Sequence, residues 1–395
     1  MIKNTADVVV IGGGVMGVAI GCELARRGAG AVAILEKKAL GAGSSGKSGA
    51  NIRCHYSHPL TTSMALYGLR TFETFTDVFG GPPVFTRAGL LIIAPPSRRR
   101  HLEFVLDLQQ RMGVKVNLIA KDELREIDPE ASLADGEVAA FEEQAGYCDA
   151  LQVVASYARA ARSKGAEIHE GSQATRILTQ NGKVTGVAAT DGEIAAGTVV
   201  LAAGPWSAAL AETAGFSLPV KPCRVQIAML RGPCSSGRPR QQPVYCDFAH
   251  ETYCRPLPGG LLHIGNIDPR EERSEVDPDA YNEVADREFV EEMRHKIQRR
   301  NPSLQRAVGR GGYGALYSVT PDWHPILGRL PGVEGVFCAV GFSGHGFKMA
   351  PAVSRILGEM ILDGAVESFD VHSLRAARFA EGEPFLNLAS AQVMG

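Results

Sequence analysis

Three glycines near the start of the sequence, and one acidic residue after them, have the types and spacing needed to bind a dinucleotide. The motif Gly12-x-Gly14-x-x-Gly17 directly follows an apolar run, and Glu36 comes 19 residues after Gly17. The first glycine of such a motif permits a tight turn, the second lets the backbone approach a pyrophosphate, and the third lets a helix pack on a strand. The pyrophosphate then meets the positive helix N-terminus, while the carboxylate binds a ribose hydroxyl. The pattern predicts a dinucleotide site, in which Glu36 would repel the extra phosphate of NADP.

The segments around this motif are typical of one strand-helix-strand unit. Residues 7–11 form a short, almost wholly apolar run, as in a parallel strand that is covered on both faces. Residues 15–27 are rich in helix formers up to Gly28, a plausible helix stop, and residues 31–35 are apolar again. We therefore expect the glycine turn between the first strand and the helix.

A second glycine-rich stretch, residues 41–50, is too polar to be a core element. It is either a flexible linker or a loop whose backbone and hydroxyl groups donate hydrogen bonds to a phosphate or a planar ring. Its start, five residues after Glu36, favours the binding loop.

Later segments of the chain look like parts of the same sheet. Residues 198–203 and 335–340 are each typical of a strand that runs into a glycine turn, and a helix-like stretch follows the second. Because these segments lie far apart in the sequence, we expect a second domain inserted between them. The expected fold class is α/β plus α+β: a Rossmann-like nucleotide-binding domain (1–84, 145–220 and 322–395) with an inserted, largely antiparallel-sheet substrate domain (85–144 and 221–321).

Composition places the chain among ordinary globular proteins. It has 395 residues, of which 45% are apolar and 21% charged, and its net charge of -2 gives no global field that favours nucleic acid. No apolar run reaches the roughly 18 residues of a membrane span. The eight cysteines include no CxxC pair, so we expect a soluble protein of the reducing cytoplasm, without a metal site. The basic runs 98–100 and 299–300 are expected on solvated helix faces.

Four motifs, taken in order, resemble those of the D-amino-acid oxidase superfamily of FAD enzymes. They are the stretches 43–53, 201–207, 317–322 and 341–348, and the similarity extends nearly to the end of the chain. The sequence most resembles the sarcosine oxidase branch, above all the beta subunit of heterotetrameric sarcosine oxidase. Glycine oxidase and proline or hydroxyproline dehydrogenases are close to it. The resemblance implies oxidation of a small amino acid, secondary, N-methyl or cyclic, by transfer of a hydride from the α-carbon to flavin N5.

The same resemblance implies which residues hold the cofactor and the substrate. Arg53 and Lys348 match two cations that hold the substrate carboxylate, although each is also compatible with an ordinary salt bridge or a solvent-facing side chain. Tyr253 matches a tyrosine of the substrate cavity, and His345 lies in the glycine turn set against the pyrimidine end of the flavin. The expected cofactor contacts are Gly12, Gly14, Val15, Met16, Gly17, Glu36, Lys37, Ser44, Ser45, Lys47, Ser48, Ala174, Ala203, Gly204, Trp206, Gly344, His345, Gly346, Phe347 and Lys348.

Three positions depart from the pattern. Ala315 stands where monomeric sarcosine oxidases link flavin to a cysteine, and Cys148 stands where heterotetrameric enzymes link a second flavin to a histidine. We therefore expect FAD to be held non-covalently. His263 falls where an oxygen-activating lysine lies in the monomeric enzymes, so the electron acceptor is oxygen, a quinone-type molecule or a partner subunit.

Two other functions are compatible with the same residues. Two cations would hold the carboxylate of a 2-hydroxy acid as well as that of an amino acid. The chain could also be a flavin-bearing electron-transfer subunit that acts only with a partner.

Overall fold

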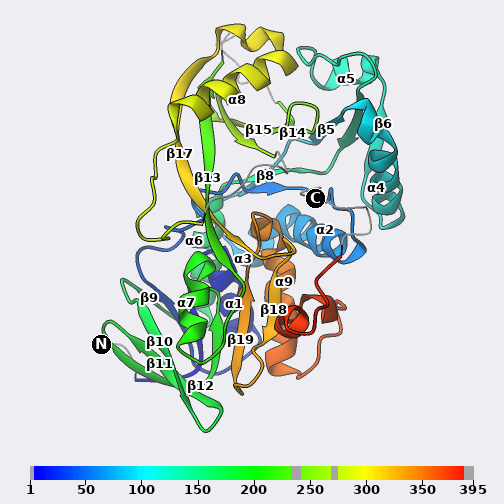
Figure 1. Ribbon diagram of the computed structural model, residues 1–395. Coiled ribbons are helices and arrows are strands. Elements are labelled where there is room, and N and C mark those ends of the chain that lie inside the picture. The colour runs from blue at the N-terminus through cyan, green and yellow to red at the C-terminus, as the bar shows by residue number, and fades with distance from the viewer. Residues whose placement is uncertain (1–3, 233–241, 268–274, 387–395) are drawn as a thin grey trace.

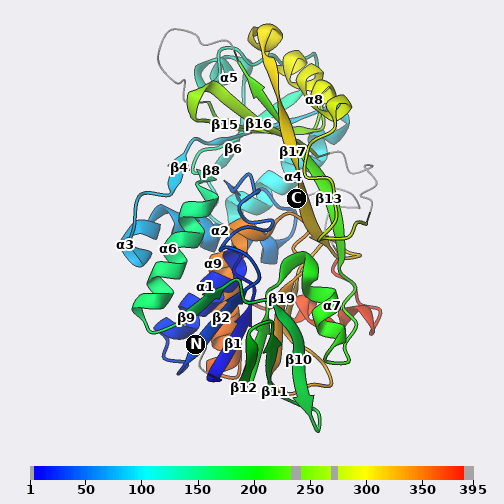
Figure 2. The ribbon, with the colours of Figure 1, turned by 90° about the vertical axis from the view of Figure 1, so that its left-hand side faces the viewer.

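Two large sheets, one in each half of the molecule, organise this protein (Figure 1). The structure, a computed structural model, describes residues 4–232, 242–267 and 275–386. The first sheet and its helices fill the lower half in Figure 1, and the second sheet lies above them. Two long strands, β13 (Lys221–Arg231) and β17 (Val308–Val319), extend from the upper sheet toward the lower half (Figures 1 and 2).

The first sheet has eight described strands, in the order β10-β11-β12-β1-β2-β9, with β19 paired to β12 and β18 to β19. Its centre is parallel, with Val8 of β1 opposite Val32 of β2 and Thr198 of β12. The strands are β1 (Thr5–Ile11), β2 (Val32–Glu36), β9 (Glu167–Glu170), β10 (Ala174–Gln180), β11 (Lys183–Ala189), β12 (Gly192–Leu201), β18 (Ile326–Arg329) and β19 (Val336–Val340).

Both faces of this sheet are covered, which explains the continuous apolar run in β1. Val8 and Val10 pack in the core formed with the long helices, while Val9 and Ile11 pack in a second core that includes residues of α7. The helices of this half are α1 (Val15–Arg26), α2 (Pro59–Glu73), α3 (Phe75–Phe79), α6 (Ala150–Ser163), α7 (Ser207–Glu212) and α9 (Gly346–Leu362).

The second sheet has the order β17-β13-β16-β15-β14-β5-β7-β6, and its strand pairs are antiparallel except β14 with β5. Phe289 and Met293 of α8 pack on one face, beside Leu91 and Ile93. The other elements are β5 (Leu90–Ala94), β6 (Val116–Ile119), β7 (Val138–Glu142), β14 (Val244–Asp247), β15 (Thr252–Leu257), β16 (Leu261–Asn266), α4 (Arg99–Arg111), α5 (Lys121–Ile127) and α8 (Arg287–Arg300).

A small antiparallel sheet links the two halves. It has the order β3-β8-β4 and positions Arg53 directly after its first strand. Its strands are β3 (Asn51–Ile52), β8 (Gly146–Cys148) and β4 (Phe85–Arg87). The predicted fold class, a Rossmann-like half with a largely antiparallel inserted half, is confirmed by the architecture. The residue limits of the two domains stay a prediction.

One expectation about charge is wrong. Arg300 was expected on a solvated helix face, but its side chain is only 1% exposed. Its guanidinium donates to Asp247 and Glu137, with the shortest contacts to these partners at 2.7 and 2.8 Å. α8 packs across the second sheet, so its last residue, Arg300, reaches two acidic partners. These partners lie far from it in the sequence, so the residues around Arg300 do not predict the contact.

The seven described cysteines are buried and form no disulfide with one another; Cys234 lies outside the described residues. Among the described residues, no helix is long and apolar enough to cross a membrane.

Candidate active site

A cavity of about 630 Å³ lies between the two sheets. Four segments of the first half line it from one side: the glycine turn before α1, the 41–50 loop, the turn after β12 and the start of α9. Strands β13, β14 and β15 line it from the other. A volume of this order is typical of small-molecule and cofactor sites. All the predicted cofactor contacts line this cavity except Gly17, which lies one turn into α1.

The glycine turn leaves no room for side chains. Gly12 has a φ of +118°, and a Cβ atom there would lie 2.4 Å from the carbonyl oxygen of Ala202. A Cβ atom on Gly17 would lie 1.8 Å from the carbonyl oxygen of Gly12. Backbone therefore faces the cavity at the N-terminus of α1, where a pyrophosphate is stabilised by the helix dipole.

Glu36 and Ser45 fix the conformation of this turn. Glu36 accepts hydrogen bonds from the backbone N–H groups of Gly13, at 2.7 Å, and Lys38, at 2.8 Å. The Ser45 hydroxyl accepts the Val15 N–H at 2.9 Å, which joins the 41–50 loop to the start of α1. The loop thus belongs to the cavity wall, as the binding-loop interpretation requires.

A segment that the sequence did not single out covers this part of the cavity. Residues 275–286, here called the strap, supply Pro278, Asp279, Tyr281 and Glu283 to the lining. Lys37 Nζ lies 2.5 Å from Asp279, and Lys47 Nζ lies 2.6 Å from Glu283 and 2.8 Å from the Tyr281 hydroxyl. The two lysines predicted as cofactor contacts therefore also fasten the strap.

Arg53 and Lys348 meet at the deep end of the cavity, where Tyr56 lies between them. Lys348 is 5% exposed, and its Nζ donates to the Tyr56 hydroxyl at 3.1 Å. The Arg53 guanidinium lies 4.9 Å from the centre of the Tyr56 ring. Burial, together with the Arg53 charge, lowers the pKa of Lys348 well below its usual value. An arriving carboxylate would favour the charged form of this amine.

The turn before α9 places helix N–H groups at the same cavity. Ser343 and Gly344 have φ values of 48° and +92°, and a Cβ atom on Gly344 would lie 2.5 Å from the Tyr317 ring. The first N–H groups of a helix have no partner within it, so backbone at 346–348 stabilises negative charge. The His345 ring packs edge-on against Tyr56, with centroids 5.7 Å apart.

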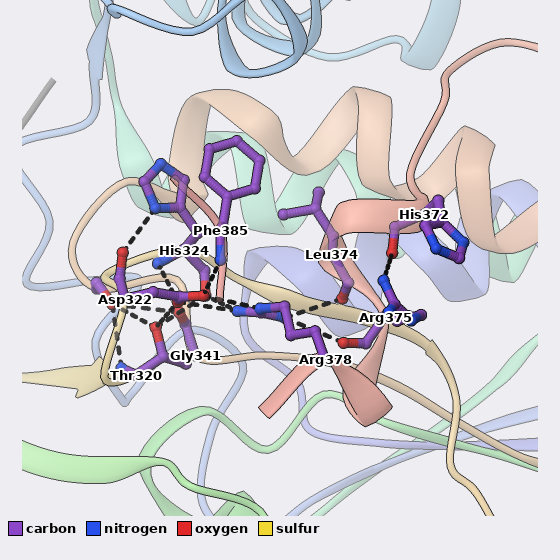
Figure 3. Close-up of polar contacts among 10 residues, drawn as sticks. Thr320, Asp322, His324, Gly341, His372, Leu374, Arg375, Arg378 and Phe385 are labelled. Atoms are coloured by element: carbon purple, nitrogen blue, oxygen red, sulfur yellow. Dashed lines mark hydrogen bonds and ion pairs between the residues drawn. The ribbon is translucent and has the colours of Figure 1, made fainter. Parts of the chain in front are cut away.

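The buried ion pair between Asp322 and Arg378 lies beside this turn and stabilises the segment that leads to it (Figure 3). Asp322 accepts hydrogen bonds from Arg378 at 2.8 and 3.0 Å and from the Phe385 N–H at 2.9 Å. Thr320, two residues earlier, donates its N–H to Ser343 at 3.3 Å. The last described segment of the chain is thereby fastened to the turn that precedes α9.

Tyr253 lines the cavity from β15, whereas His263 lies behind Gly49, itself a lining residue. His263 is 3% exposed, and its Nε2 is 2.9 Å from the Tyr313 hydroxyl. Burial, and then the charge of Arg255, lower the pKa of His263 to about 3. This imidazole is neutral at physiological pH.

Ala315 and Cys148, the two positions considered for covalent attachment of flavin, lie in different parts of the structure. Ala315 lines the cavity with a methyl group. Cys148 is buried beside Asp149, whose carboxylate caps α6 by accepting the Gln152 N–H at 3.0 Å.

With this geometry established, the chain can be compared with known proteins. Residues 7–360 match the family described as FAD dependent oxidoreductase. The chain belongs to this family. It is 27% identical to 4-methylaminobutanoate oxidase (formaldehyde-forming) of Paenarthrobacter nicotinovorans, over 94% of this chain but 45% of that protein. It is also 27% identical to the peroxisomal sarcosine oxidase of Homo sapiens, over 95% of this chain and 97% of that one.

A solved structure described as L-proline dehydrogenase from P. horikoshii has the same fold, with a TM-score of 0.89 and 26% identity over 97% of this chain and 100% of that one. Members of the FAD-dependent oxidoreductase family use FAD, and the residues present fit that cofactor. A dinucleotide with an anionic ring requires three kinds of group, and the cavity offers each of them. They are the glycine turn at α1, the fixed Glu36 carboxylate and the N-terminus of α9.

Proposed function

We propose that this FAD-dependent oxidoreductase oxidises a small amino acid at the carbon that bears a secondary, N-methyl or cyclic amine next to the carboxylate. The observation that carries the proposal is the pair of cations, Arg53 and Lys348, held together by Tyr56 at the buried end of the cavity. A guanidinium fork and a lysine point charge are suited to one carboxylate.

FAD, when bound, supplies the acceptor of a hydride from the substrate α-carbon. The chain's own residues orient the substrate: Arg53 and Lys348 hold the carboxylate, so the α-carbon has one orientation in the cavity. The apolar side chains of Ile227 and Val244 line the opposite wall and exclude water, which favours the neutral amine. The imine product leaves and hydrolyses in water.

Relatives support this substrate class. The names of the compared proteins specify 4-methylaminobutanoate, sarcosine and L-proline, each an amine that carries a carboxylate. A further relative, 25% identical, is the sarcosine oxidase subunit beta of Rhodobacter capsulatus, which favours a partner subunit as a second hypothesis for electron transfer. The neutral His263 favours an acceptor other than oxygen, such as a quinone-type molecule.

Anaerobic loss of the visible flavin absorbance tests the proposal. The FAD-loaded protein is mixed with a panel of amino acids and with matched 2-hydroxy acids. We expect reduction by secondary or N-methyl amino acids only. Reduction by hydroxy acids alone would replace amine oxidation with alcohol oxidation, and reduction by neither would contradict an enzyme that acts without a partner.

A substitution tests the carboxylate site in the same assay. Lys348→Met should weaken the apparent substrate affinity by about 10- to 150-fold, the loss of one charge-assisted hydrogen bond. Lys183→Met, at an exposed ion pair with Glu334, is the matched control and should leave the affinity unchanged. Unchanged affinity in Lys348→Met would remove this lysine from the substrate site.

A further inference from the structure

A buried carboxylate outside the cavity lining interacts electrostatically with the two cations and has no assigned role. Glu142, the last residue of β7, has 0% exposure. Its Oε1 accepts the backbone N–H of Cys54 at 2.8 Å. Its Oε2 is buried and has no partner with hydrogen-bond geometry among the described residues, although the Cys54 side chain also interacts with the carboxylate. A buried carboxylate with an unsatisfied oxygen is costly to folding, which suggests a functional role.

The hydrogen bond from Cys54 connects Glu142 to the substrate site through the backbone. Cys54 directly follows Arg53, so the accepted N–H fixes the peptide unit that carries the arginine. Without this acceptor, the Cys54 N–H would be buried and unpaired, and the Arg53 backbone would be free to rearrange. The position of the guanidinium therefore depends on Glu142.

Charge connects Glu142 to the same site. The titratable groups that face this cluster are Arg53, Cys54 and Tyr56 after β3, Cys246 on β14, and Lys348 on α9. Burial raises the pKa of Cys54 well above its usual value, that of Cys246 to about 11 and that of Tyr56 to about 12, so these three are neutral near pH 7. Arg53 stays charged throughout.

Among the groups named here, Glu142 changes charge near pH 7. Burial raises the pKa of Glu142 to about 7. The Cys54 N–H and the two cations lower this pKa, but burial has the larger effect. Burial and then the Arg53 charge lower the pKa of Lys348 well below its usual value.

We propose that Glu142 is a positioning residue of the substrate site, which fixes the Arg53 backbone and supplies the negative charge that the substrate carboxylate replaces. The inference rests on the proposed function only in placing a carboxylate at Arg53 and Lys348. When Glu142 is ionised it repels that carboxylate, and when it is protonated it does not. Above about pH 7, binding of a carboxylate is therefore accompanied by uptake of up to one proton from solvent at Glu142.

Binding of a simple carboxylate to the FAD-loaded protein tests this inference. Acetate is titrated between pH 6 and pH 9 and followed by the change in the flavin spectrum, with no turnover involved. In the unsubstituted protein the dissociation constant should rise with pH above about 7, by at most about tenfold per pH unit, because Glu142 loses its proton there. Glu142→Gln should bind acetate more tightly at pH 8 and lose most of this slope.

The choice of variants separates charge from structure. Glutamine still offers an oxygen to the Cys54 N–H, so a purely structural role would leave the pH profile of Glu142→Gln like that of the unsubstituted protein. Glu143→Gln, at the exposed neighbouring residue, is the matched control and should keep the normal profile.

Lys348→Met provides a second test that does not depend on folding of the Glu142 variant. This variant should bind acetate more weakly but keep the part of the slope that Glu142 supplies, because it removes only the proton taken up at Lys348. Complete loss of the slope in Lys348→Met, or an unchanged slope in Glu142→Gln, would overturn the role of Glu142. An enzyme that binds acetate with the expected profile but is not reduced by amino acids would refute the proposed function while leaving this inference intact.

Discussion

The strap should determine how long the protein retains FAD. Residues 275–286 close the cavity beside the glycine turn, and two ion pairs, Lys37 with Asp279 and Lys47 with Glu283, fasten them there. The two acidic side chains are 51% and 63% exposed, so each pair contributes only the 0.2–1 kcal/mol typical of surface ion pairs. Together they favour the closed strap by about 0.4–2 kcal/mol, or roughly 2- to 30-fold.

If FAD leaves only when the strap is open, the double variant Asp279→Asn with Glu283→Gln should release FAD about 2- to 30-fold faster. Release is followed by the rise in flavin fluorescence after the protein is diluted into buffer without FAD. High salt should accelerate release from the unsubstituted protein toward the rate of the variant, because salt screens exposed pairs.

A matched control distinguishes the strap from surface charge in general. Glu334→Gln removes a more exposed pair, with Lys183 at the start of β11, and it should leave the release rate unchanged. Equal release rates in the double variant and the unsubstituted protein would refute the reasoning. So would an equal salt dependence of the two.

Three further outcomes are expected. Acid precipitation should leave yellow FAD in the supernatant, because Ala315 offers no nucleophile; a yellow pellet under a colourless supernatant would show covalent attachment. Pre-reduced protein should reoxidise slowly in air, and His263→Lys should accelerate that step without changing anaerobic reduction, since a lysine has a higher intrinsic pKa than the neutral imidazole; fast reoxidation in both would contradict the role of His263. Arg378→Met should lower the free energy of unfolding by about 3–5 kcal/mol in a urea titration, because it leaves Asp322 buried and uncompensated (Figure 3); a loss below 1 kcal/mol would show that the pair is not needed.

The features that sequence predicted well depend on short-range patterns. The expected strand at 7–11 is Thr5–Ile11, the expected helix at 15–27 is Val15–Arg26, and Glu36 ends β2 as expected. These follow from glycine geometry and apolar runs within about 30 residues. Arg53 and Lys348 were found through motifs, and the structure brings them to one cavity.

The features that sequence missed depend on contacts between distant segments. Asp279 and Glu283 meet Lys37 and Lys47 across more than 230 residues of chain. Glu142 is 88 residues from Cys54, and Arg300 is 53 residues from Asp247. No local pattern distinguishes these charged residues from others on the surface, because their burial is decided by how the sheets pack.

The order of strands in the first sheet has a consequence for how the protein is made. β1 ends at residue 11, yet its partner β12 ends at residue 201, so one edge of the apolar β1 stays unpaired for about 190 residues of synthesis. At about 5–20 residues per second, that interval lasts about 10–40 s. Exposed apolar strand edges aggregate, so the nascent chain is a natural client for chaperones. The N-terminus of α9, which lines the cofactor cavity, is made later still, because this helix begins at residue 346.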